Sequence, residues 1–290
     1  STQALELNTL PSSAVIIGAG AVALEFASLW NAAGCEVTLL IRKDRVLSTW
    51  ERRASMTLTR ELKRRGVNVI ARTAVDRVDT GANLGATVHY RQGDSDEDRT
   101  AYGEVVLAAI GRVPNTDADW FRSSGLKLDE RGYVTVDGYG RTNLDGVWAL
   151  GDITPGHALA HRAFEQGITI AEKIAGADPK PVLDDTVPQV VFSFPEAASV
   201  GLTLDQAKAR EDVVEPKETA YPMLSNARML MSGEGGSMTV VSGAFANNPD
   251  MQVVLGVHIV SPIASDLIAE AEQLVGNRVP LADAARLIHP

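Results

Sequence analysis

Cysteine is almost absent from this chain of 290 residues. Cys35 is the only one, so neither an internal disulfide nor a metal site built from several cysteines can form within the chain. It lies in AAGCEVTLL, an apolar segment between a predicted helix and a predicted strand. We therefore interpret Cys35 as an inert buried thiol.

Long apolar runs and an excess of basic residues are also missing. No apolar stretch approaches the roughly 18 to 20 residues that a membrane-spanning helix needs, and the first residues lack the pattern of a secretion signal. Lys and Arg number 27 against 37 Asp and Glu, which gives a formal net charge of -10. This balance argues against a nucleic-acid partner, because phosphate binding depends on clustered Lys and Arg. We expect a cytoplasmic protein that contacts no membrane.

The first part of the chain alternates between strands and helices. Residues 14–17 are a short apolar run, residues 21–33 have helical spacing of apolar side chains, and residues 36–41 indicate a second buried strand. A helix over residues 51–65 and a strand at residues 67–70 follow. This βαβαβ order predicts a parallel sheet with right-handed crossovers.

The pattern then changes to an antiparallel one. Short alternating segments over residues 73–100 predict a meander, and an apolar strand is expected at residues 104–109. A helix is expected over residues 158–175, and the stretch 175–185, rich in Pro, Gly and Asp, is the best domain boundary. The predicted fold class is α/β, a Rossmann-like nucleotide-binding domain with an antiparallel meander, followed by a C-terminal α+β domain.

A glycine motif lies between the first strand and the first helix. In Gly18-Ala19-Gly20-Ala21-Val22-Ala23, Gly18 allows the tight turn, Gly20 lets the backbone approach a pyrophosphate, and Ala23 lets the helix pack on the strand. The phosphate would lie at the helix N-terminus. The motif alone is weak, but its place at the head of a βαβ unit predicts nucleotide binding.

The residues after the second strand bear on which nucleotide binds. An NAD site normally has Asp or Glu there, to hold the ribose 2'-hydroxyl, whereas this chain has Ile41 followed by Arg42, Lys43 and Arg45. Cationic side chains at that place favour a 2'-phosphate. We therefore predict NADP rather than NAD, with a solvated basic turn as the alternative interpretation.

Four segments together resemble a known family. They are AAIGRVPN (residues 108–115), TNLDGVWALGD (142–152), VPQVVFSFPEAASVGLT (187–203) and the carboxy-terminal IHP. With the glycine motif, they resemble the flavoprotein disulfide reductases of the pyridine nucleotide-disulfide oxidoreductase family, which includes lipoamide dehydrogenase, glutathione reductase and mycothione reductase. The resemblance implies an NAD(P)-binding domain over residues 1–115, the C-terminal part of an FAD-binding domain over 116–180 and a truncated dimerisation domain over 181–290.

The resemblance also implies an FAD site. Gly151 and Asp152 match the turn whose carboxylate holds the ribityl chain of FAD. The backbone of Ala158, Leu159 and Ala160, at the start of the following helix, would face the flavin, and the helix dipole would stabilise negative charge on the reduced ring. A simpler interpretation of Asp152 is that it only forms a turn.

Further roles follow from the same resemblance. Glu25 matches a family glutamate that pairs with a lysine beside the flavin, although an exposed helix residue is the alternative. Gly111 and Arg112 would join the nucleotide and FAD domains. His289 is either the catalytic base or the histidine that precedes it in an HxHPT sequence.

The chain also departs from the family pattern. The FAD-binding GxGxxG and the redox-active CxxxxC pair of the family do not occur in it, and Ala21 replaces the tyrosine that gates the nicotinamide pocket in glutathione reductase. The sequence stops at His289-Pro290, before the glutamate that normally orients the histidine. We expect a fragment of a longer oxidoreductase, with a natural non-catalytic nucleotide-binding module as the alternative.

The resemblance implies FAD and NADP (or NAD) as cofactors, a small-molecule substrate and a homodimer. The activity expected is dihydrolipoamide dehydrogenase-like hydride transfer between the nicotinamide and FAD. A 2-oxoacid dehydrogenase complex is an expected partner only if the protein is a lipoamide dehydrogenase. A quinone reductase, a transhydrogenase and a mycothione reductase share the same motifs, so the substrate stays open.

Overall fold

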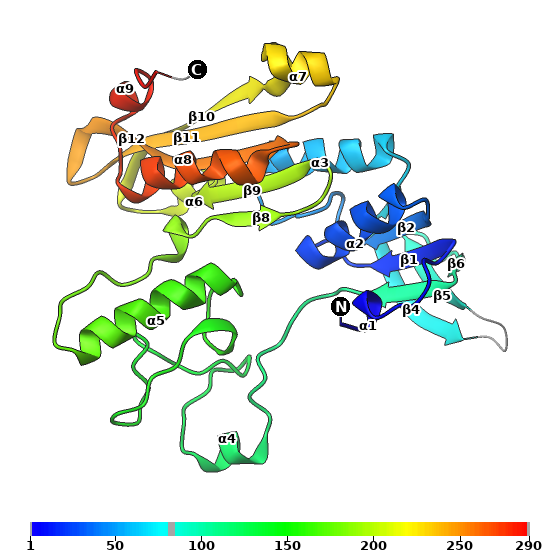
Figure 1. The fold of residues 1–290 in the computed structure, drawn as a ribbon, viewed down its shortest axis with the longest axis horizontal. Helices are drawn as coiled ribbons and strands as arrows, with labels where there is room; N and C mark the ends of the chain where they lie inside the picture. The colour runs from blue at the N-terminus through cyan, green and yellow to red at the C-terminus, as the bar shows by residue number, and fades with distance from the viewer. Residues whose placement is uncertain (1, 81–84, 289–290) are drawn as a thin grey trace. The chain divides into compact units, whose positions relative to one another are not determined.

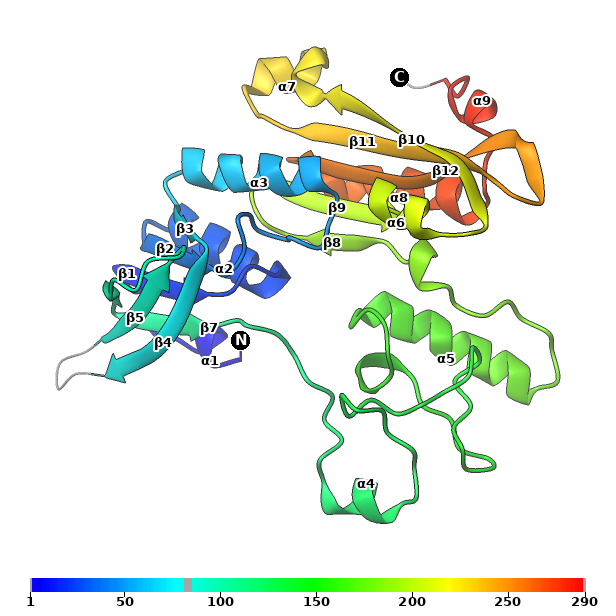
Figure 2. The ribbon, with the colours of Figure 1, turned by 180° about the vertical axis from the view of Figure 1, so that it is seen from behind.

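A computed structural model describes residues 2–80 and 85–288 of the chain. The chain forms two compact units. The first consists of Ser1–Gly111 and Pro188–Pro290, and the second is Arg112–Val187. Figures 1 and 2 show the ribbon from opposite sides.

A parallel sheet organises the first part of the first unit (Figure 1). Its strands, in the order β3-β2-β1-β7, are β1 (Ser13–Ile17), β2 (Glu36–Ile41), β3 (Asn68–Ala71) and β7 (Val105–Ala108). Helix α2 (Ala21–Ala32) connects β1 to β2, and α3 (Arg52–Arg64) connects β2 to β3. The strands are rich in Val, Leu and Ile because parallel strands are covered on both faces. The predicted βαβαβ unit is confirmed.

An antiparallel meander covers part of this sheet. It consists of β4 (Thr73–Thr80), β5 (Ala86–Gln92) and β6 (Arg99–Gly103), in that order. Val88 and Tyr90 of β5 are buried against Val15 and Leu40 of the parallel sheet. The predicted meander is therefore confirmed.

A second, antiparallel sheet forms the rest of the first unit. Its order is β10-β11-β12-β9-β8, with β8 (Gln189–Val191), β9 (Glu196–Gly201), β10 (Val213–Pro222), β11 (Ser237–Phe245) and β12 (Asn248–Ser261). Helix α8 (Ala264–Gly276) packs on one face, in front of the sheet in Figure 1. Helix α3 packs on β11 and β12, and lies in front in Figure 2. The predicted C-terminal α+β domain is confirmed.

Alternate side chains of β12 and β9 pack into two different hydrophobic cores. Val257 and Ile259 pack with α8. Val260 and Ala197 instead join the core that contains Leu24 of α2. This period of two is the one expected of a strand buried on both faces. As a result, the parallel sheet and the antiparallel sheet share one hydrophobic core.

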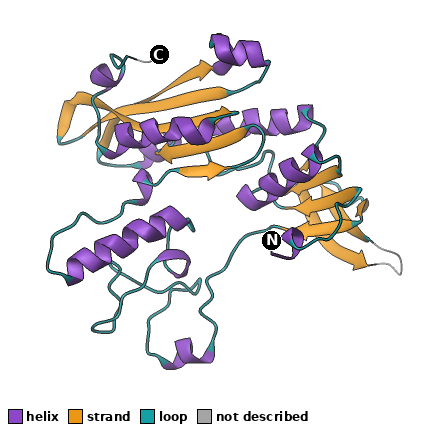
Figure 3. Ribbon diagram, in the orientation of Figure 1, coloured by secondary structure: helices purple, strands orange, loops and turns teal. Residues whose placement is uncertain are grey.

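The remaining elements are short. In the first unit they are α1 (Thr2–Leu5), α6 (Leu204–Ala209), the 3-10 helix η3 (Met223–Ser225), α7 (Ala227–Ser232) and α9 (Leu281–Ala284). In the second unit they are α4 (Asp119–Ser123), η1 (Gly151–Ile153), α5 (Ala160–Ile174) and η2 (Asp184–Thr186). Loops connect the elements of the second unit (Figure 3). Within residues 2–80 and 85–288, no helix is both long and apolar enough to cross a membrane.

A buried arginine ties the end of the second unit to α5. The Arg162 side chain is 6% exposed, and its Nε donates to the Asp184 carboxylate at 2.6 Å. Its Nη2 donates to the carbonyl oxygen of Pro155, also at 2.6 Å. A buried guanidinium needs such partners. Residues 175–185, which are predicted as a domain boundary, are therefore bound to α5 through Asp184.

A buried histidine lies in the middle of the antiparallel sheet. His258 of β12 is 0% exposed, and its Nε2 lies 3.2 Å from the carbonyl oxygen of Leu202. A carbonyl can only accept, so Nε2 carries the proton and Nδ1 accepts from the Ser199 hydroxyl at 2.7 Å. Burial lowers the pKa of His258, against the raising effects of the hydrogen bond to Leu202 and of the Glu51 charge.

We predict that His258 makes the fold less stable in acid. Below pH about 6.5, the usual histidine pKa, the unfolded chain binds a proton that folded His258 rejects, so up to about 1.4 kcal/mol of stability is lost per pH unit until the lower, folded-state pKa is reached. Urea unfolding at several pH values between 5 and 7.5, for the wild type and His258→Gln, measures this slope. The substitution should flatten it, whereas equal slopes in both proteins would contradict the prediction.

Candidate nucleotide-binding site

A tight turn follows β1 at the carboxyl end of the parallel sheet. Gly18 has a φ of +141°, and a Cβ there would lie 2.2 Å from the carbonyl oxygen of Ala109. Ala109 follows β7, and its N–H donates to the carbonyl of Ile17 at 2.8 Å. A side chain at Gly18 would therefore force β1 and β7 apart.

Gly20 differs from Gly18 because the space beside it is open. It precedes α2 with a φ of -90°, and a Cβ there would meet nothing within 4 Å. The first N–H groups of any helix have no acceptor within the helix. In α2, which has 12 residues, no side chain caps them either. Free N–H groups and the positive end of the helix dipole favour a phosphate. A dinucleotide pyrophosphate fits this place, since the missing side chain lets it approach the backbone.

The third small residue of the motif is packed inside. Ala23 is 0% exposed and belongs to the core that also contains Ile16 of β1. A small side chain at this position lets α2 lie close to the strand. The structure thus brings Gly18, Gly20 and Ala23 together at one end of the sheet, as the sequence predicts.

The basic loop after β2 lies against the same turn. The Leu47 N–H donates to the carbonyl of Ala19 at 2.9 Å, and Val46 and Leu47 are buried in the core below it. The Ser55 hydroxyl of α3 donates to the carbonyl of Val46. Val46 and Leu47, which directly follow residues 42–45, are therefore fixed between the glycine turn and α3.

The three basic residues of this loop are not equivalent. Arg45 is occupied, because its Nη1 pairs with Asp44 at 3.0 Å and its Nη2 donates to the carbonyl of Ser48 at 3.2 Å. Arg42 and Lys43 are exposed, and their side chains make no hydrogen bond or ion pair with the residues that the structure describes. Arg42 and Lys43 are thus the residues of the loop with free charge for a phosphate.

Sequence reasoning missed a further cation at this edge. Arg72 follows β3, and its N–H donates to the carbonyl of Lys43 at 3.0 Å. Arg72 is exposed and has a φ of +57°, in the region that favours glycine. The signal available in the sequence is its position two residues beyond the strand predicted at residues 67–70.

The expected FAD residues lie together in the second unit. Gly151 N–H donates to Gln166 of α5 at 2.9 Å, and a Cβ on Gly151 would lie 3.4 Å from Ala163. Asp152, the next residue, is exposed. These contacts hold η1, which contains Asp152, beside α5.

The start of α5 resembles the start of α2. Ala158 and Leu159 precede α5, which begins at Ala160, and no side chain caps the helix. The positive end of the helix dipole suits the phosphate groups of a flavin nucleotide, and the Asp152 carboxylate suits its hydroxyl groups. The residues present therefore fit part of an FAD site.

The other predicted site residues are placed as follows. Glu25 of α2 is half-buried, and its Oε1 accepts from the Phe192 N–H, after β8, at 3.0 Å. Gly111 ends the first unit with a φ of +140°, and Arg112 begins the second. His289 lies outside the described residues.

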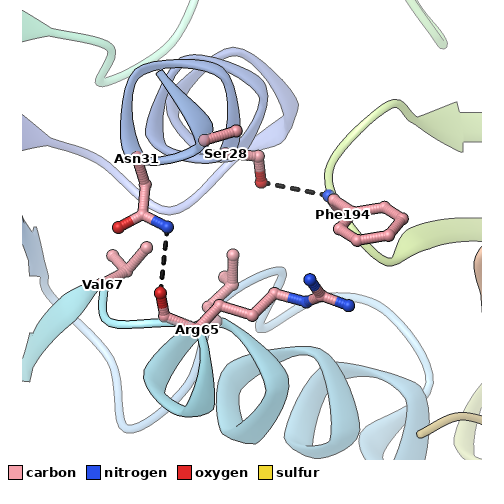
Figure 4. A pocket seen from close by; sticks show the side chains of 7 residues that line it. Ser28, Asn31, Arg65, Val67 and Phe194 are labelled. Carbon is pink, nitrogen blue, oxygen red and sulfur yellow. Dashed lines mark hydrogen bonds between the residues drawn. The ribbon is translucent and has the colours of Figure 1, made fainter. Parts of the chain in front are cut away.

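A cavity of about 270 Å³ lies between the later turns of α2, the end of α3 and Phe194 (Figure 4). Asn31 donates to the carbonyl of Arg65 at 3.0 Å across it, and Ser28 accepts from the Phe194 N–H at 3.1 Å. The Arg65 guanidinium lies 3.8 Å from the centre of the Phe194 ring and pairs with Glu234. These contacts connect α2 with α3 and with the segment between β8 and β9. The buried Nε of Arg65 has no hydrogen-bond partner among the described residues.

The thiol of the chain takes no part in the site. Cys35 is buried, and burial raises its pKa, with further contributions from the charges of Glu104 and Glu36. A raised pKa keeps the thiol protonated and unreactive near neutral pH. The interpretation of Cys35 as a buried, inert residue agrees with this environment.

Comparison with known proteins identifies the family. Residues 1–167 match the model of the pyridine nucleotide-disulphide oxidoreductases, and residues 187–290 match the dimerisation domain of the same group. The chain belongs to the pyridine nucleotide-disulphide oxidoreductase family. The resemblance inferred from the motifs is therefore confirmed.

Relatives of this family member include dihydrolipoyl dehydrogenases. Those of Cupriavidus necator and Geobacillus stearothermophilus are each 36% identical to it, over 289 and 295 residues. These alignments cover 99% and 100% of this chain, but 59% of each relative. The crystal structure of LpdA from Mycobacterium tuberculosis is similar with a TM-score of 0.86 at 29% identity, covering 99% of this chain and 60% of LpdA. The chain thus spans about three fifths of the length of these relatives.

We predict that the two glycines of the turn respond differently to alanine. Gly18→Ala should lower the free energy of unfolding by about 3 kcal/mol or more, because the new Cβ collides with the Ala109 carbonyl. Gly20→Ala should change stability by less than about 1 kcal/mol and still weaken NADPH binding at least roughly tenfold, since its Cβ fills the phosphate space.

Urea unfolding and calorimetric titration with NADPH measure the two effects separately. Each variant is the control for the other, because an added Cβ meets the backbone of Ala109 at position 18 and meets no atom within 4 Å at position 20. Wild-type affinity in Gly20→Ala would show that no phosphate approaches this helix.

Proposed function

We propose that this chain binds a pyridine nucleotide at the glycine turn and moves hydride between it and FAD, in an oxidoreductase of the dihydrolipoyl dehydrogenase type that acts on a disulfide or dithiol. The observation that carries the proposal is the open space beside Gly20 at the uncapped start of α2. The family and the dihydrolipoyl dehydrogenase relatives support the reaction class.

The nucleotide that we propose is NADP. Arg42 and Lys43 lie beside the turn, are exposed and make no ion pair with the described residues. No Asp or Glu follows β2 directly, where a carboxylate would bind the ribose 2'-hydroxyl of NAD and repel a 2'-phosphate. Guanidinium and ammonium groups favour the additional phosphate of NADP instead.

The second cofactor that we propose is FAD. When bound, FAD supplies the acceptor and donor of hydride. Asp152 would accept hydrogen bonds from the hydroxyl groups of the cofactor, and the N–H groups at the start of α5 would stabilise negative charge on it. The chain passes from the first unit, which contains the proposed nucleotide site, to the second unit, which contains the proposed FAD residues, between Gly111 and Arg112.

Glu25 has a positioning role in this proposal. Its carboxylate already binds the Phe192 backbone through Oε1, so it is held in a fixed direction at the junction of α2 and the segment after β8. A carboxylate fixed in this way can also accept from a lysine, as the family resemblance implies. The role of His289 as a base, or as the residue before it, stays a prediction.

Assembly and substrate complete the proposal. The match of residues 187–290 to a dimerisation domain supports a homodimer. The relatives named dihydrolipoyl dehydrogenase support a small-molecule substrate and make a 2-oxoacid dehydrogenase complex one partner to test. The cytoplasmic location and the division into domains at residues 115 and 180 also stay predictions.

Calorimetric titration with NADPH and NADH tests the proposal. The wild-type protein should bind NADPH more tightly than NADH. Changing both Arg42 and Lys43 to Ala should remove roughly 2 to 4 kcal/mol of NADPH binding, because two charge-assisted hydrogen-bonding groups are lost, and should leave NADH binding nearly unchanged.

A matched control has Arg60 and Lys63 both changed to Ala. These cations are exposed on the later turns of α3, so the control loses the same charge away from the glycine turn. Equal affinity of the wild type for both nucleotides, or equal effects of the two double variants, would refute the NADP assignment.

A further inference from the structure

Arg42 and Arg72 are neighbours across two parallel strands. β2 and β3 pair in register, with Leu40 opposite Ile70 and Ile41 opposite Ala71, so the next residues along are the two arginines. Neighbouring strands lie about 4.8 Å apart. The register therefore places Arg72 beside the basic loop, although 30 residues separate it from Arg42 in sequence.

Two hydrogen bonds fix this arrangement. The Arg72 N–H donates to the carbonyl of Lys43 at 3.0 Å, and the Thr73 hydroxyl donates to the carbonyl of Ile41 at 3.1 Å. The carbonyl of Arg72 accepts from the Gly93 N–H at 2.8 Å. The backbone of Arg72 is thus held on both sides, and its position relative to Lys43 is set by the fold.

The three cations have no counter-charge. The side chains of Arg42, Lys43 and Arg72 are all exposed, and none makes an ion pair or hydrogen bond with another residue in the described ranges 2–80 and 85–288. In a chain with a net charge of -10, carboxylates are abundant, yet none of those that the structure describes forms an ion pair with these three side chains. Such a cluster favours an external anion.

The backbone conformation at Arg72 is one that arginine rarely adopts. Its φ of +57° lies in the left-handed region, where glycine or asparagine is preferred and arginine is uncommon. Glycine would remove this backbone strain, so the arginine side chain at this exposed position has a use that stability does not explain.

We propose that Arg72 binds the 2'-phosphate of the adenosine end of NADP together with Arg42 and Lys43, and is a specificity-determining residue outside the glycine motif and the basic loop. This inference rests on the proposed nucleotide site. A guanidinium presents paired N–H donors to two phosphate oxygens, and the negative charge of the phosphate complements the three positive charges.

Arg72→Gly tests the proposal without straining the fold. Because glycine suits the positive φ, the free variant should unfold at the same temperature as the wild type or at a higher one. Its Kd for NADPH should rise roughly tenfold, while its Kd for NADH should change by less than about twofold. Arg72→Lys, which keeps the charge without the fork of donors, should fall between the two proteins.

The matched control is Arg278→Gly. Arg278 is also an exposed arginine with a positive φ, 51°, but it follows α8 and lies over the Phe245 ring, 4.3 Å from its centre. The same substitution there should leave both Kd values unchanged. Calorimetry with NADPH and NADH and thermal unfolding of all variants give the result.

Two results would overturn the inference. The first is that Arg72→Gly binds NADPH with the Kd of the wild type. The second is that Arg72→Gly loses NADPH and NADH binding equally, which would mean that Arg72 contacts a part common to both nucleotides. The double change of Arg42 and Lys43 to Ala separates this failure from failure of the proposed function. If that variant loses the NADPH preference and Arg72→Gly does not, only the role of Arg72 is wrong.

Discussion

The close approach of Gly18 to the carbonyl of Ala109 is the contact on which the site depends. It lets β1 and β7 pair to their ends and still turns the chain sharply into α2. The turn exposes the start of α2 beside Gly20. It also offers the carbonyl of Ala19 to Leu47, which fixes the basic loop. The proposed phosphate site and the position of the basic loop therefore both depend on one backbone contact.

Helix α3 connects this edge of the sheet to the rest of the first unit. At its start, Glu51 accepts from the N–H groups of Arg53 and Ala54, and Ser55 binds the basic loop. Further along, Thr57 lies 3.3 Å from the Ser237 hydroxyl of β11. The two sheets also share a hydrophobic core. The proposed nucleotide site thus rests on packed secondary structure, as precise binding geometry requires.

The sequence predicts local features well and register poorly. The turn at Gly18 and Gly20, the strands of the parallel sheet and the meander follow from residue pattern and conformational preference alone. The pairing of Arg45 with Asp44 and the position of Arg72 do not, because the first depends on a side-chain conformation and the second on alignment of two strands. The partners of Glu25 likewise required the contact between α2 and the segment after β8. Long-range pairing decides which charges remain free.

We propose that the carboxyl end of the parallel sheet binds NADP, and a crystal structure of the protein with NADPH tests this proposal. We expect the pyrophosphate at the N–H groups of Ala21 and Val22, and the 2'-phosphate within hydrogen-bond distance of Arg42 and Lys43. A nucleotide bound elsewhere, or bound with its 2'-phosphate turned away from this loop, would refute it.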